Sequence, residues 1–571
     1  MSGRINLWRE FFRPPTKSLC APGGLQKCTS RQGRLARSRL TYSTRASTAE
    51  SRARPNLPLW TTSRALLLAG ALASIGYAVG VNDAGNHAHE LTPRPPKYAS
   101  KQEMDKAISE LRSLLGEDAI STEDENLQAH GYSEWSSINI DQLPVAVAYP
   151  KTTGEVSQIA KIATKYKIPM VPFSGGSSLE ANFAAPFGGS ASTLLQPSIQ
   201  WMELNEKLKH TGLLFPVDPG PSAKIGGMIG TSCSGTNAFR YGTMKDWVIN
   251  LTVVLPDGRI IKTRRRPRKT SAGYNLTGLF VGAEGTLGIV TEATLKLAVV
   301  PQETKVAVAT FPTIRDAAAA AMQVIRSGVP VAAMEIMDDV QMSVINKAGG
   351  TNRTWKEVPT LFFKFAGTTA GVQDNIKTTT QIAKRNNGGD IVYAKNDQEA
   401  HDLWKARKDS LWSMLSLRRE GDEVWSTDVG VPISRLPDIV DLSKKELDDL
   451  GLFASILGHI GDGNFHASIL YNRKDPAERE RVERVVHNMV DRALEMEGTC
   501  TGEHGIGLGK KQSLIDELGL DTINVMQTLK RSLDPHWLMN PGKIFDAVNA
   551  GNTRDQHEAT AASTLERPKN K

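Results

Sequence analysis

Hydrophobic and polar positions alternate with two different periods along residues 97–300, and the two periods indicate strands and helices in turn. The pattern predicts helices over 104–115 and 154–167. It predicts strands over 145–149 and 169–173. The chain then enters Ser174-Gly-Gly-Ser-Ser178. A strand–helix–strand unit that ends in a glycine loop exposes backbone N–H groups to a phosphate, although the loop alone also fits an ordinary turn.

Three further stretches rich in small residues follow this loop: Asp218–Met228, Cys233–Gly242 and Ala283–Gly288. Small residues at this density let a backbone approach a large planar ligand closely. Between them, the pattern over 248–263 predicts a β-hairpin, and the basic run 264–269 fits a solvated hairpin edge. None of these stretches is a Gly-x-Gly-x-x-Gly sequence after the first strand, which disfavours a Rossmann domain for a nicotinamide cofactor.

A different pattern begins near residue 305 and continues to about residue 500. Helices are predicted over 314–327, 372–386, 397–415, 434–450 and 477–497. Strands are predicted over 331–336, 360–366, 424–430, 452–458 and 465–470. This order predicts an antiparallel sheet covered by helices, and therefore a separate α+β domain.

The positive charge of the chain is concentrated at its N-terminus. Residues 1–64 hold eleven Arg and two Lys against two acidic residues, so the rest of the chain carries a net charge of −3 although the total is +8. The remaining sequence has no basic patch with interleaved aromatic residues, which argues against nucleic-acid binding. A segment rich in Arg, Ser and Thr and poor in acids is typical of a mitochondrial transit peptide, and a disordered basic tail is the alternative.

Residues 65–81 form an uncharged run at the short limit for crossing a bilayer. Arginines flank only its N-terminal side, so we expect that side in the matrix and the rest of the protein facing the intermembrane space. The run is either an inner-membrane anchor or a sorting segment that is removed. Residues 82–98 are a proline-containing linker, and 547–571 are predicted to be a disordered tail. Only Cys233 and Cys500 lie beyond the presequence, too few for a disulfide framework.

Two short segments near the C-terminus carry the most specific chemistry. His459-Ile-Gly-Asp-Gly-Asn-Phe-His466 places two imidazoles around a Gly-Asp-Gly turn, and Glu503 is followed directly by His504. Two imidazoles and one carboxylate suffice to bind a divalent transition metal, which leaves one histidine for proton transfer. Two unrelated loops with hydrogen-bonded histidines are the alternative, and a metal site of this kind can also serve hydrolysis.

The chain resembles the FAD-dependent 2-hydroxy-acid dehydrogenases of the vanillyl-alcohol-oxidase (PCMH) type. The resemblance is carried by Ser174–Ser178, Ser234–Ala238, Ala283–Gly288, His459–His466 and Gly502–Gly505. It covers about residues 97–546 and is closest to the mitochondrial members that oxidise D-lactate to pyruvate with a cytochrome as acceptor. It implies an α+β fold in which a two-subdomain FAD-binding domain over 140–300 precedes an α+β substrate domain over 301–546. That domain would contain an antiparallel sheet and a C-terminal helical segment that returns to the flavin.

The resemblance also implies roles for individual residues. FAD would be bound without a covalent link, because the glycine loop has no histidine for attachment. Its binding residues would be Ser174, Gly175, Gly176, Ser177, Ser178, Ser234, Gly235, Thr236, Glu284, Gly285, Asn540 and Lys543. His459, His466 and Glu503 would hold Zn²⁺ or Mn²⁺. His504 would take the hydroxyl proton while the hydride passes to the flavin, and Arg407 would bind the C1 carboxylate in bidentate fashion. Helix periodicity alone would make Arg407 a surface charge.

Ser426 bears on the choice of substrate. Relatives that act on D-2-hydroxyglutarate tend to have Lys at this position, where a second cation meets the distal carboxylate. Serine cannot neutralise that charge, and burying an unpaired carboxylate is costly. We therefore expect a small monoacid such as D-lactate, with D-2-hydroxyglutarate or another D-2-hydroxy acid as the alternative. Cytochrome c is the expected electron acceptor at the outer face of the inner membrane. A non-redox flavoenzyme related to alkyl-dihydroxyacetone-phosphate synthase is disfavoured by the metal residues together with Arg407.

One departure from the family pattern concerns the FAD-binding domain. Only Gly188–Leu195 joins the glycine loop to the segment that begins at Gln196, where relatives have two strands, so roughly twenty residues are missing. Loss of a strand pair from a cofactor-binding sheet exposes core and unpaired edges. We therefore expect one of two explanations. Either the gene model skips coding sequence at this point, or this form of the protein binds FAD poorly.

Overall fold

The computed structural model describes residues 95–187, 191–194, 198–350 and 353–547. The predicted transit peptide, the apolar segment 65–81, most of the linker and nearly all of the predicted C-terminal tail lie outside these ranges. Within the described part of the chain, no helix combines the length and the apolar character needed to cross a bilayer.

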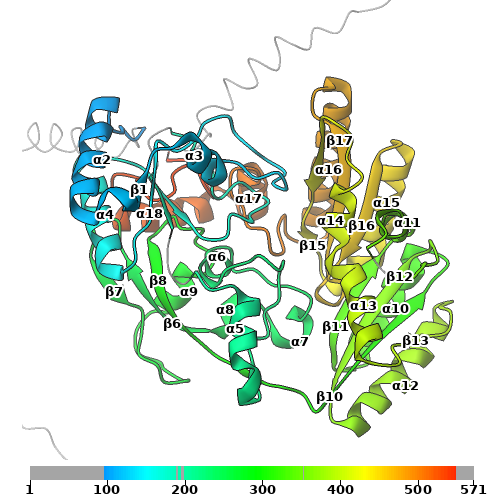
Figure 1. The fold of residues 1–571 in the computed structure, drawn as a ribbon. Helices are drawn as coiled ribbons and strands as arrows, with labels where there is room; N and C mark the ends of the chain where they lie inside the picture. The colour runs from blue at the N-terminus through cyan, green and yellow to red at the C-terminus, as the bar shows by residue number, and fades with distance from the viewer. Residues whose placement is uncertain (1–94, 188–190, 195–197, 351–352, 548–571) are drawn as a thin grey trace, which may run out of the picture. The chain divides into compact units, whose positions relative to one another are not determined.

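The N-terminal part of the described chain builds a four-stranded sheet with two helices packed on it (Figure 1). Its strand order is β1–β2–β4–β3, with β4 parallel to both neighbours and β1 antiparallel to β2. The strands are β1 (Ile120–Ser121), β2 (Ala146–Ala148), β3 (Met170–Phe173) and β4 (Ala191–Leu194). The helices of this part are α2 (Lys101–Leu115), α3 (Asp124–Gly131) and α4 (Thr153–Tyr166), with the short 3-10 helix η1 (Glu117–Ala119). The predicted strand–helix–strand unit is β2–α4–β3.

Helix α4 is fixed at its start by a cap and along its length by one apolar face. The Thr152 hydroxyl accepts a hydrogen bond from the Glu155 N–H at 3.2 Å. Val156, Ile159 and Ala163 are spaced three and four residues apart, so they share one face and are buried against the sheet. The glycine loop therefore begins at the end of a strand whose position is set by packing.

The chain returns to this sheet near its C-terminus. The Met170 N–H donates to the Leu538 carbonyl, and the Asn540 N–H donates to the Met170 carbonyl, each at 2.7 Å. Residues 538–540 therefore run parallel to β3 at its free edge. This pairing places the C-terminal segment beside the strand that leads into the glycine loop, as the predicted return requires.

Residues 198–300 contain two small antiparallel sheets, β5–β9 and β7–β6–β8. The strands are β5 (Leu213–Leu214), β6 (Val248–Val254), β7 (Ile260–Lys262), β8 (Ile289–Leu295) and β9 (Ala298–Val299). The helices are α5 (Trp201–Leu208), α6 (Ile225–Thr231), α7 (Ala238–Tyr241), α8 (Met244–Trp247) and α9 (Leu276–Phe280), with the 3-10 helix η2 (Lys209–Thr211). Val299 on β9 is 74% exposed and lies on the two-stranded β5–β9 sheet. The shortening itself stays a prediction.

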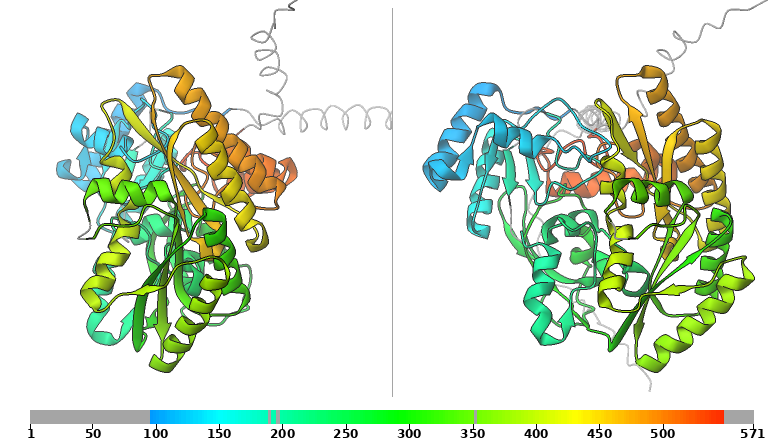
Figure 2. Two further views of the ribbon diagram at one scale, coloured as in Figure 1. Left: turned by 90° about the vertical axis from the view of Figure 1, so that its right-hand side faces the viewer. Right: turned by 45° about the vertical axis from the view of Figure 1, so that its right-hand side comes forward.

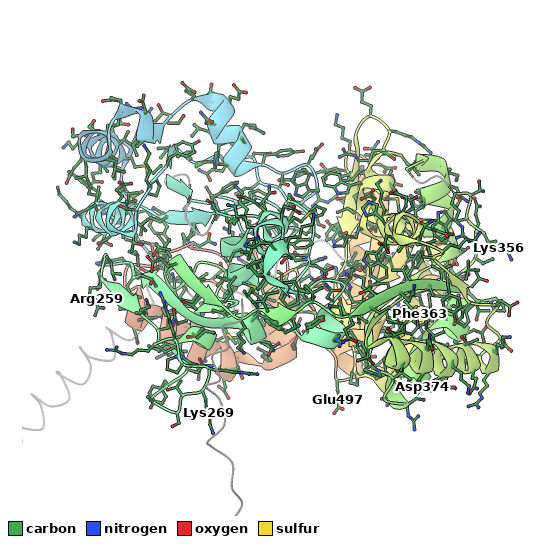
Figure 3. The ribbon with its side chains drawn as sticks, turned by 60° about the horizontal axis from the view of Figure 1, so that its bottom comes forward. Arg259, Lys269, Lys356, Phe363, Asp374 and Glu497 are labelled. Carbon is green, nitrogen blue, oxygen red and sulfur yellow. The ribbon has the colours of Figure 1, made fainter. Side chains whose placement is uncertain are left out.

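The predicted hairpin is the pair β6–β7, with Thr252 opposite Lys262. The basic run that follows it lies at the surface. Figure 3 shows the side chains of Arg259 and Lys269 at the periphery of the molecule, and residues 265–270 are exposed. The basic run is therefore a solvated surface segment, as its position beside a hairpin predicts.

The C-terminal part is an eight-stranded antiparallel sheet with helices on both faces (Figures 1 and 2). Its order is β13–β10–β12–β11–β16–β17–β14, and β15 pairs with β17. The strands are β10 (Glu303–Thr310), β11 (Val331–Met337), β12 (Thr360–Gly367), β13 (Val392–Tyr393), β14 (Asp422–Ser426), β15 (Val429–Gly430), β16 (Phe453–Gly458) and β17 (Asn464–Asn472). The helices are α10 (Ile314–Arg326), α11 (Asp339–Ala348), α12 (Thr369–Arg385), α13 (Asp397–Lys408), α14 (Ser410–Leu415), α15 (Leu436–Asp449), α16 (Pro476–Glu495), α17 (Lys511–Leu518) and α18 (Leu520–Leu533), with the 3-10 helices η3 (Ile433–Arg435) and η4 (Ile460–Asp462).

Alternate residues of these strands face different helix layers, because successive side chains of a strand point to opposite faces. On β10, Ala307 and Ala309 belong to the core shared with α10, α12, α15 and α16, whereas Val306 and Val308 belong to the core shared with α11 and α13. Both faces are therefore covered, and β11 in the middle of the sheet is buried over its whole length.

The α+β architecture predicted from the sequence is confirmed, and its element boundaries differ in one informative place. The helix predicted over 397–415 is divided into α13 and α14 at Asp409, whose backbone leaves the helical region. The Ser410 hydroxyl donates to the Arg407 carbonyl, a local bond that competes with continuation of the helix. This break ends α13 at Lys408, one residue after Arg407.

Candidate functional site

Glu503 lies between the rings of His459 and His466. His459 directly follows β16, His466 lies on the neighbouring strand β17, and η4 joins the two strands. The turn is tight at Gly463, which has φ of +76°, and a Cβ there would collide with the Val431 carbonyl. Glu503 Oε1 lies 2.9 Å from His459 Nε2 and 3.4 Å from His466 Nε2. The two segments predicted to share a site are therefore brought together.

The other nitrogen of each ring has a fixed partner. His459 Nδ1 donates to Glu335 Oε1, and His466 Nδ1 donates to the Thr427 carbonyl, both at 3.0 Å. Because carboxylates and carbonyls only accept hydrogen bonds, each Nδ1 carries a hydrogen and each Nε2 turns toward Glu503. Two imidazole lone pairs and a carboxylate oxygen repel one another unless a proton or a cation lies among them. The residues thus fit a divalent cation, and partners on the far nitrogens are usual for metal-binding histidines.

Charge coupling within this group is strong. Burial opposes the charged form of His459, but Glu335 and Glu503 outweigh it and raise the pKa of His459 well above its ordinary value. Burial likewise opposes ionisation of Glu503, but His459 and His466 lower the pKa of Glu503 well below its ordinary value. The carboxylate of Glu503 is therefore ionised, as a metal ligand must be.

Asp428 holds the loop that carries Glu503 and His504. Its Oδ2 accepts hydrogen bonds from the N–H groups of Gly502, Glu503 and His504 at 2.8, 2.8 and 2.9 Å. The Asp428 side chain is 1% exposed, and Lys510 lies 3.8 Å from the same oxygen. A buried carboxylate that accepts three successive N–H groups fixes the backbone of the loop, so the direction of the Glu503 side chain is set by this anchor.

His504 stacks on His466, and its Nδ1 lies 4.0 Å from Asp428 Oδ2 without a hydrogen bond. The two ring centroids are 4.9 Å apart and the rings are inclined by 9°. His504 Nδ1 is buried and has no hydrogen-bond partner among the described residues. Burial lowers the pKa of His504 to about 4, although Asp428 opposes the shift. A neutral imidazole at the cavity wall beside the metal ligands is placed to accept a proton.

Arg407 is buried, in contrast to the surface position that helix periodicity indicates. It is 7% exposed at the end of α13, and its Nε and Nη2 donate to Glu335 Oε2 at 2.9 and 2.8 Å. Glu335 is 1% exposed and lies on β11. One edge of the guanidinium is therefore committed to Glu335, and the edge formed by Nη1 and Nη2 is the one left for a ligand carboxylate.

The predicted flavin residues and the metal ligands line one cavity of about 380 Å³. Its walls come from the glycine loop 174–178, from the small-residue stretches around 218–236 and 284–285, and from Asn540. Arg407, His459, His466, Glu503 and His504 line the same space. The Ser174 hydroxyl is buried without a hydrogen-bond partner among the described residues. Gly176, two residues after Ser174, has φ of +64°. An unpaired hydroxyl beside a glycine backbone fits the phosphates of FAD.

Two predicted cofactor residues lie outside the cavity wall. The Ser234 hydroxyl donates to Glu503 Oε2 at 2.6 Å, so it orients a metal ligand. Lys543 is 1% exposed, and its Nζ donates to the Ala184 carbonyl at 2.7 Å. Burial lowers the pKa of Lys543 to about 7, although Glu284 opposes the shift. Lys543 joins the C-terminal return to the first domain and does not face the cavity.

Glu284 and Asn540 line the cavity but use their side chains to join parts of the protein. Glu284 Oε1 accepts from the Ile506 N–H at 2.6 Å, and its Oε2 accepts from the Gly507 N–H at 2.8 Å. Asn540 Nδ2 donates to the Glu284 carbonyl at 2.7 Å. Glu284 therefore attaches the loop after His504 to the flavin-binding part of the chain.

Sequence reasoning missed two residues that organise the site. Glu335 interrupts the otherwise apolar run Val331–Met337, in which each residue is buried. A carboxylate in the middle of a buried strand is costly unless paired, and this was the signal that could have found it. Asp428 lies two residues after Ser426 and has no local signal in the sequence, because its role depends on residues more than seventy positions away.

Comparison with known proteins identifies the family. A family model of the C-terminal domain of FAD linked oxidases matches residues 300–544, and a model of an FAD binding domain matches residues 190–264. The mitochondrial D-lactate dehydrogenase (cytochrome) of Kluyveromyces lactis is 45% identical over 479 residues, which cover 79% of this chain and 83% of the relative. The corresponding Arabidopsis thaliana protein is 43% identical over 462 residues, covering 78% and 81%.

Solved structures agree on the fold. p-Cresol methylhydroxylase matches with a TM-score of 0.65 at 18% identity, covering 79% of this chain and 99% of that one. An alkyldihydroxyacetonephosphate synthase matches with a TM-score of 0.59 at 20% identity, covering 79% and 86%. At these identities the likeness concerns the fold alone. The sequence relatives go further, and the chain belongs to the FAD-dependent D-2-hydroxy-acid dehydrogenase family that includes the mitochondrial D-lactate dehydrogenases (cytochrome).

Proposed function

We propose that this protein oxidises D-lactate to pyruvate with FAD and a divalent metal, and passes the electrons to cytochrome c. The observation that carries the proposal is the single cavity in which the glycine loops, Arg407 and the group His459, His466 and Glu503 meet. The names of the relatives from Kluyveromyces lactis, Arabidopsis thaliana and Saccharomyces cerevisiae support both the substrate and the cytochrome acceptor.

The flavin-binding residues would lie along the walls of the cavity. Ser174 to Ser178 would hold the pyrophosphate, where the unpaired Ser174 hydroxyl supports the assignment. Gly235 and Gly285 have positive φ and would let the backbone approach the ring system. When bound, FAD supplies the acceptor for the hydride that leaves the C2 carbon of the substrate.

The remaining residues would bind and orient the substrate and remove its proton. Arg407 would hold the carboxylate through Nη1 and Nη2, because Glu335 occupies its other edge. His504 would take the hydroxyl proton at the nitrogen that faces the substrate. His459, His466 and Glu503 would hold a Zn²⁺ or Mn²⁺ ion. When bound, such an ion lowers the pKa of the substrate hydroxyl. Ser234 would keep Glu503 directed at that ion.

The cavity favours a monocarboxylate over a dicarboxylate. Ser426 is 5% exposed and lines the cavity. Its hydroxyl is uncharged, so it cannot neutralise a distal carboxylate of the substrate. D-2-hydroxyglutarate is the second candidate, because Lys408 lines the same cavity and a D-2-hydroxyglutarate dehydrogenase of Stutzerimonas stutzeri is 27% identical over 473 residues. Lys408 Nζ lies 3.2 Å from Asp218 Oδ2, however, so its charge already has a buried partner.

We place the flavin domain at 140–300 and the substrate domain at 301–546, and the ranges of the two family models support this division. The proposed location is the mitochondrial inner membrane, facing the intermembrane space. The basic segment 1–64, the apolar run 65–81 and the mitochondrial names of the relatives support it. Import of a tagged chain into isolated mitochondria, followed by protease treatment of mitoplasts, tests this placement.

Dye-linked oxidation assays test the proposed substrate. Purified protein is expected to oxidise D-lactate at least tenfold faster than L-lactate or D-2-hydroxyglutarate at equal concentrations, and to lose activity after treatment with a chelator. Restoring Mn²⁺ or Zn²⁺ should restore the rate. Equal turnover of D-2-hydroxyglutarate would favour the second candidate. A colourless protein without flavin absorbance would show that the chain is the flavin-deficient variant that its shortened domain suggests.

Gly235→Ala is expected to lower the fraction of protein that retains FAD. Gly235 has φ of +144°, and a Cβ would lie 2.5 Å from the Asp218 carbonyl carbon, so the cavity wall must shift. The ratio of flavin to protein absorbance measures the loss. Gly273→Ala is the control, since that glycine also has a positive φ of +76° but no atom within 4 Å of the new Cβ. Equal flavin retention in the two variants would contradict the assignment of Gly235 to the flavin wall.

A further inference from the structure

The two carboxylate oxygens of Glu335 contact two different site residues, Arg407 and the predicted metal ligand His459. Oε2 accepts from Arg407 Nε and Nη2 at 2.9 and 2.8 Å, and Oε1 accepts from His459 Nδ1 at 3.0 Å. The side chain is 1% exposed and lies on β11 in the middle of the large sheet. Its neighbours on that strand, Met334 and Ile336, are buried in the core on the opposite face of the sheet, so packing fixes the backbone that carries Glu335.

Only a side chain with two acceptor oxygens satisfies both neighbours. Arg407 and the Nδ1–H of His459 are both donors, and each needs an acceptor because both side chains are buried. A glutamine amide has one acceptor oxygen and one donor nitrogen. It would satisfy one neighbour and set a donor against the other. An aspartate would be too short by one carbon to reach both groups from the same backbone position.

We propose that Glu335 is a positioning residue that fixes the Nδ1–H tautomer of His459 toward the metal and the orientation of Arg407 toward the substrate carboxylate. The inference rests on the proposed function. It adds that one buried carboxylate couples the metal ligand to the carboxylate clamp, so the two are set together. A carboxylate behind a metal-binding histidine typically changes metal affinity 10–100-fold when it is removed.

Binding of Mn²⁺ to flavin-loaded, metal-stripped protein tests the inference without reference to turnover. Free Mn²⁺ is measured by electron paramagnetic resonance during a titration. Glu335→Gln is expected to weaken Mn²⁺ binding at least tenfold and, in the metal-saturated enzyme, to raise KM for D-lactate at least tenfold. Flavin absorbance and the melting temperature confirm that the variant is folded.

Asp338→Asn is the matched control. Asp338 is another buried carboxylate three residues further along the chain, and its Oδ1 accepts from the Gln341 N–H at 2.7 Å to cap α11. It contacts neither Arg407 nor His459 among the hydrogen bonds and ion pairs of the described residues. Asparagine caps a helix about as well as aspartate, so the variant is expected to keep the cap and to lose stability only through the ion pair with Lys444. It is expected to bind Mn²⁺ within about twofold of the parent.

Arg407→Met provides an independent test that does not depend on the folding of the glutamine variant. It removes the clamp but leaves Glu335 to accept from His459. We expect a higher KM for D-lactate with Mn²⁺ affinity within about threefold of the parent. Unchanged Mn²⁺ affinity in Glu335→Gln, or a tenfold loss of Mn²⁺ affinity in Arg407→Met, would overturn the role of Glu335. Either result would leave the proposed function standing. Absence of Mn²⁺ and Zn²⁺ binding in the parent protein would instead overturn the metal in the proposed function, and the inference with it.

Discussion

Replacing Glu503 with glutamine is expected to lower kcat/KM for D-lactate by about 1,000-fold, which corresponds to about 4 kcal/mol of transition-state stabilisation. Glu503 Oε1 faces both histidine Nε2 atoms, at 2.9 and 3.4 Å, so it is the group the two imidazoles share. A neutral amide at this position offers a weaker ligand and no charge to balance the cation. Steady-state kinetics with saturating Mn²⁺ and metal analysis of the dialysed protein measure the effect.

Glu517→Gln is the control for this variant. Glu517 supports the same loop, because its Oε2 accepts from the Cys500 N–H at 2.9 Å and from the Thr499 hydroxyl at 3.1 Å. It contacts no predicted metal ligand through these bonds. We expect this change to affect stability while the bound metal remains. A Glu503→Gln enzyme that keeps its metal and its kcat/KM would refute the ligand assignment.

Asp534→Ala is expected to lower the free energy of unfolding by about 3–5 kcal/mol, because it leaves a buried lysine without its counter-ion. Lys530 and Asp534 are each 1% exposed, and Lys530 Nζ donates to Asp534 Oδ2 at 2.5 Å. Asp534 also accepts from the N–H groups of Leu538 and Met539 at 2.9 and 2.7 Å. The residues that it holds are those that pair with β3. The variant should therefore also release flavin at a lower urea concentration than the parent.

The chain contains a matched control for this pair. Lys445 and Asp449 have the same spacing of four residues and the same 2.5 Å separation, but their side chains are 71% and 62% exposed. Asp449→Ala should leave the free energy of unfolding nearly unchanged, because solvent screens an exposed ion pair. Urea titrations followed by flavin and tryptophan fluorescence compare the two variants. Equal losses in both would contradict the claim that burial makes Asp534 important.

The sequence pattern predicted the core of the fold because that information is local. Strands such as β11 and β12 are largely apolar runs, broken in their interiors only by Glu335 and Lys364, and α4 repeats its apolar residues every three or four positions. Periodicity did not predict helices α17 and α18, although the family resemblance implied a C-terminal helical segment. α17 buries only Leu514 among its residues, and α18 buries polar Gln527 and Lys530 beside Ile523. An apolar period cannot reveal a helix whose buried face is largely polar.

The candidate site was predictable to a similar extent. The spacing of His459 and His466 around a Gly-Asp-Gly turn, and the adjacency of Glu503 and His504, are local features that a reader of the sequence can find. The link from Arg407 to Glu335 spans 72 positions along the chain, and the anchor from Asp428 to the Glu503 loop spans 75. Partners at that separation are set by the sheet topology. The buried position of Arg407 and the role of Glu335 therefore emerge only from the fold.

Anaerobic stopped-flow absorbance at 450 nm tests the central claim most directly, because it follows the flavin alone and needs no electron acceptor. In metal-loaded protein, D-lactate is expected to bleach the flavin in a single exponential phase, while L-lactate leaves it oxidised. In metal-stripped protein that retains FAD, bleaching by D-lactate should be slower by about 1,000-fold and should recover when Mn²⁺ is added. Equally fast bleaching by D-lactate with and without the metal would contradict a site in which the metal ligands and the flavin cavity act together.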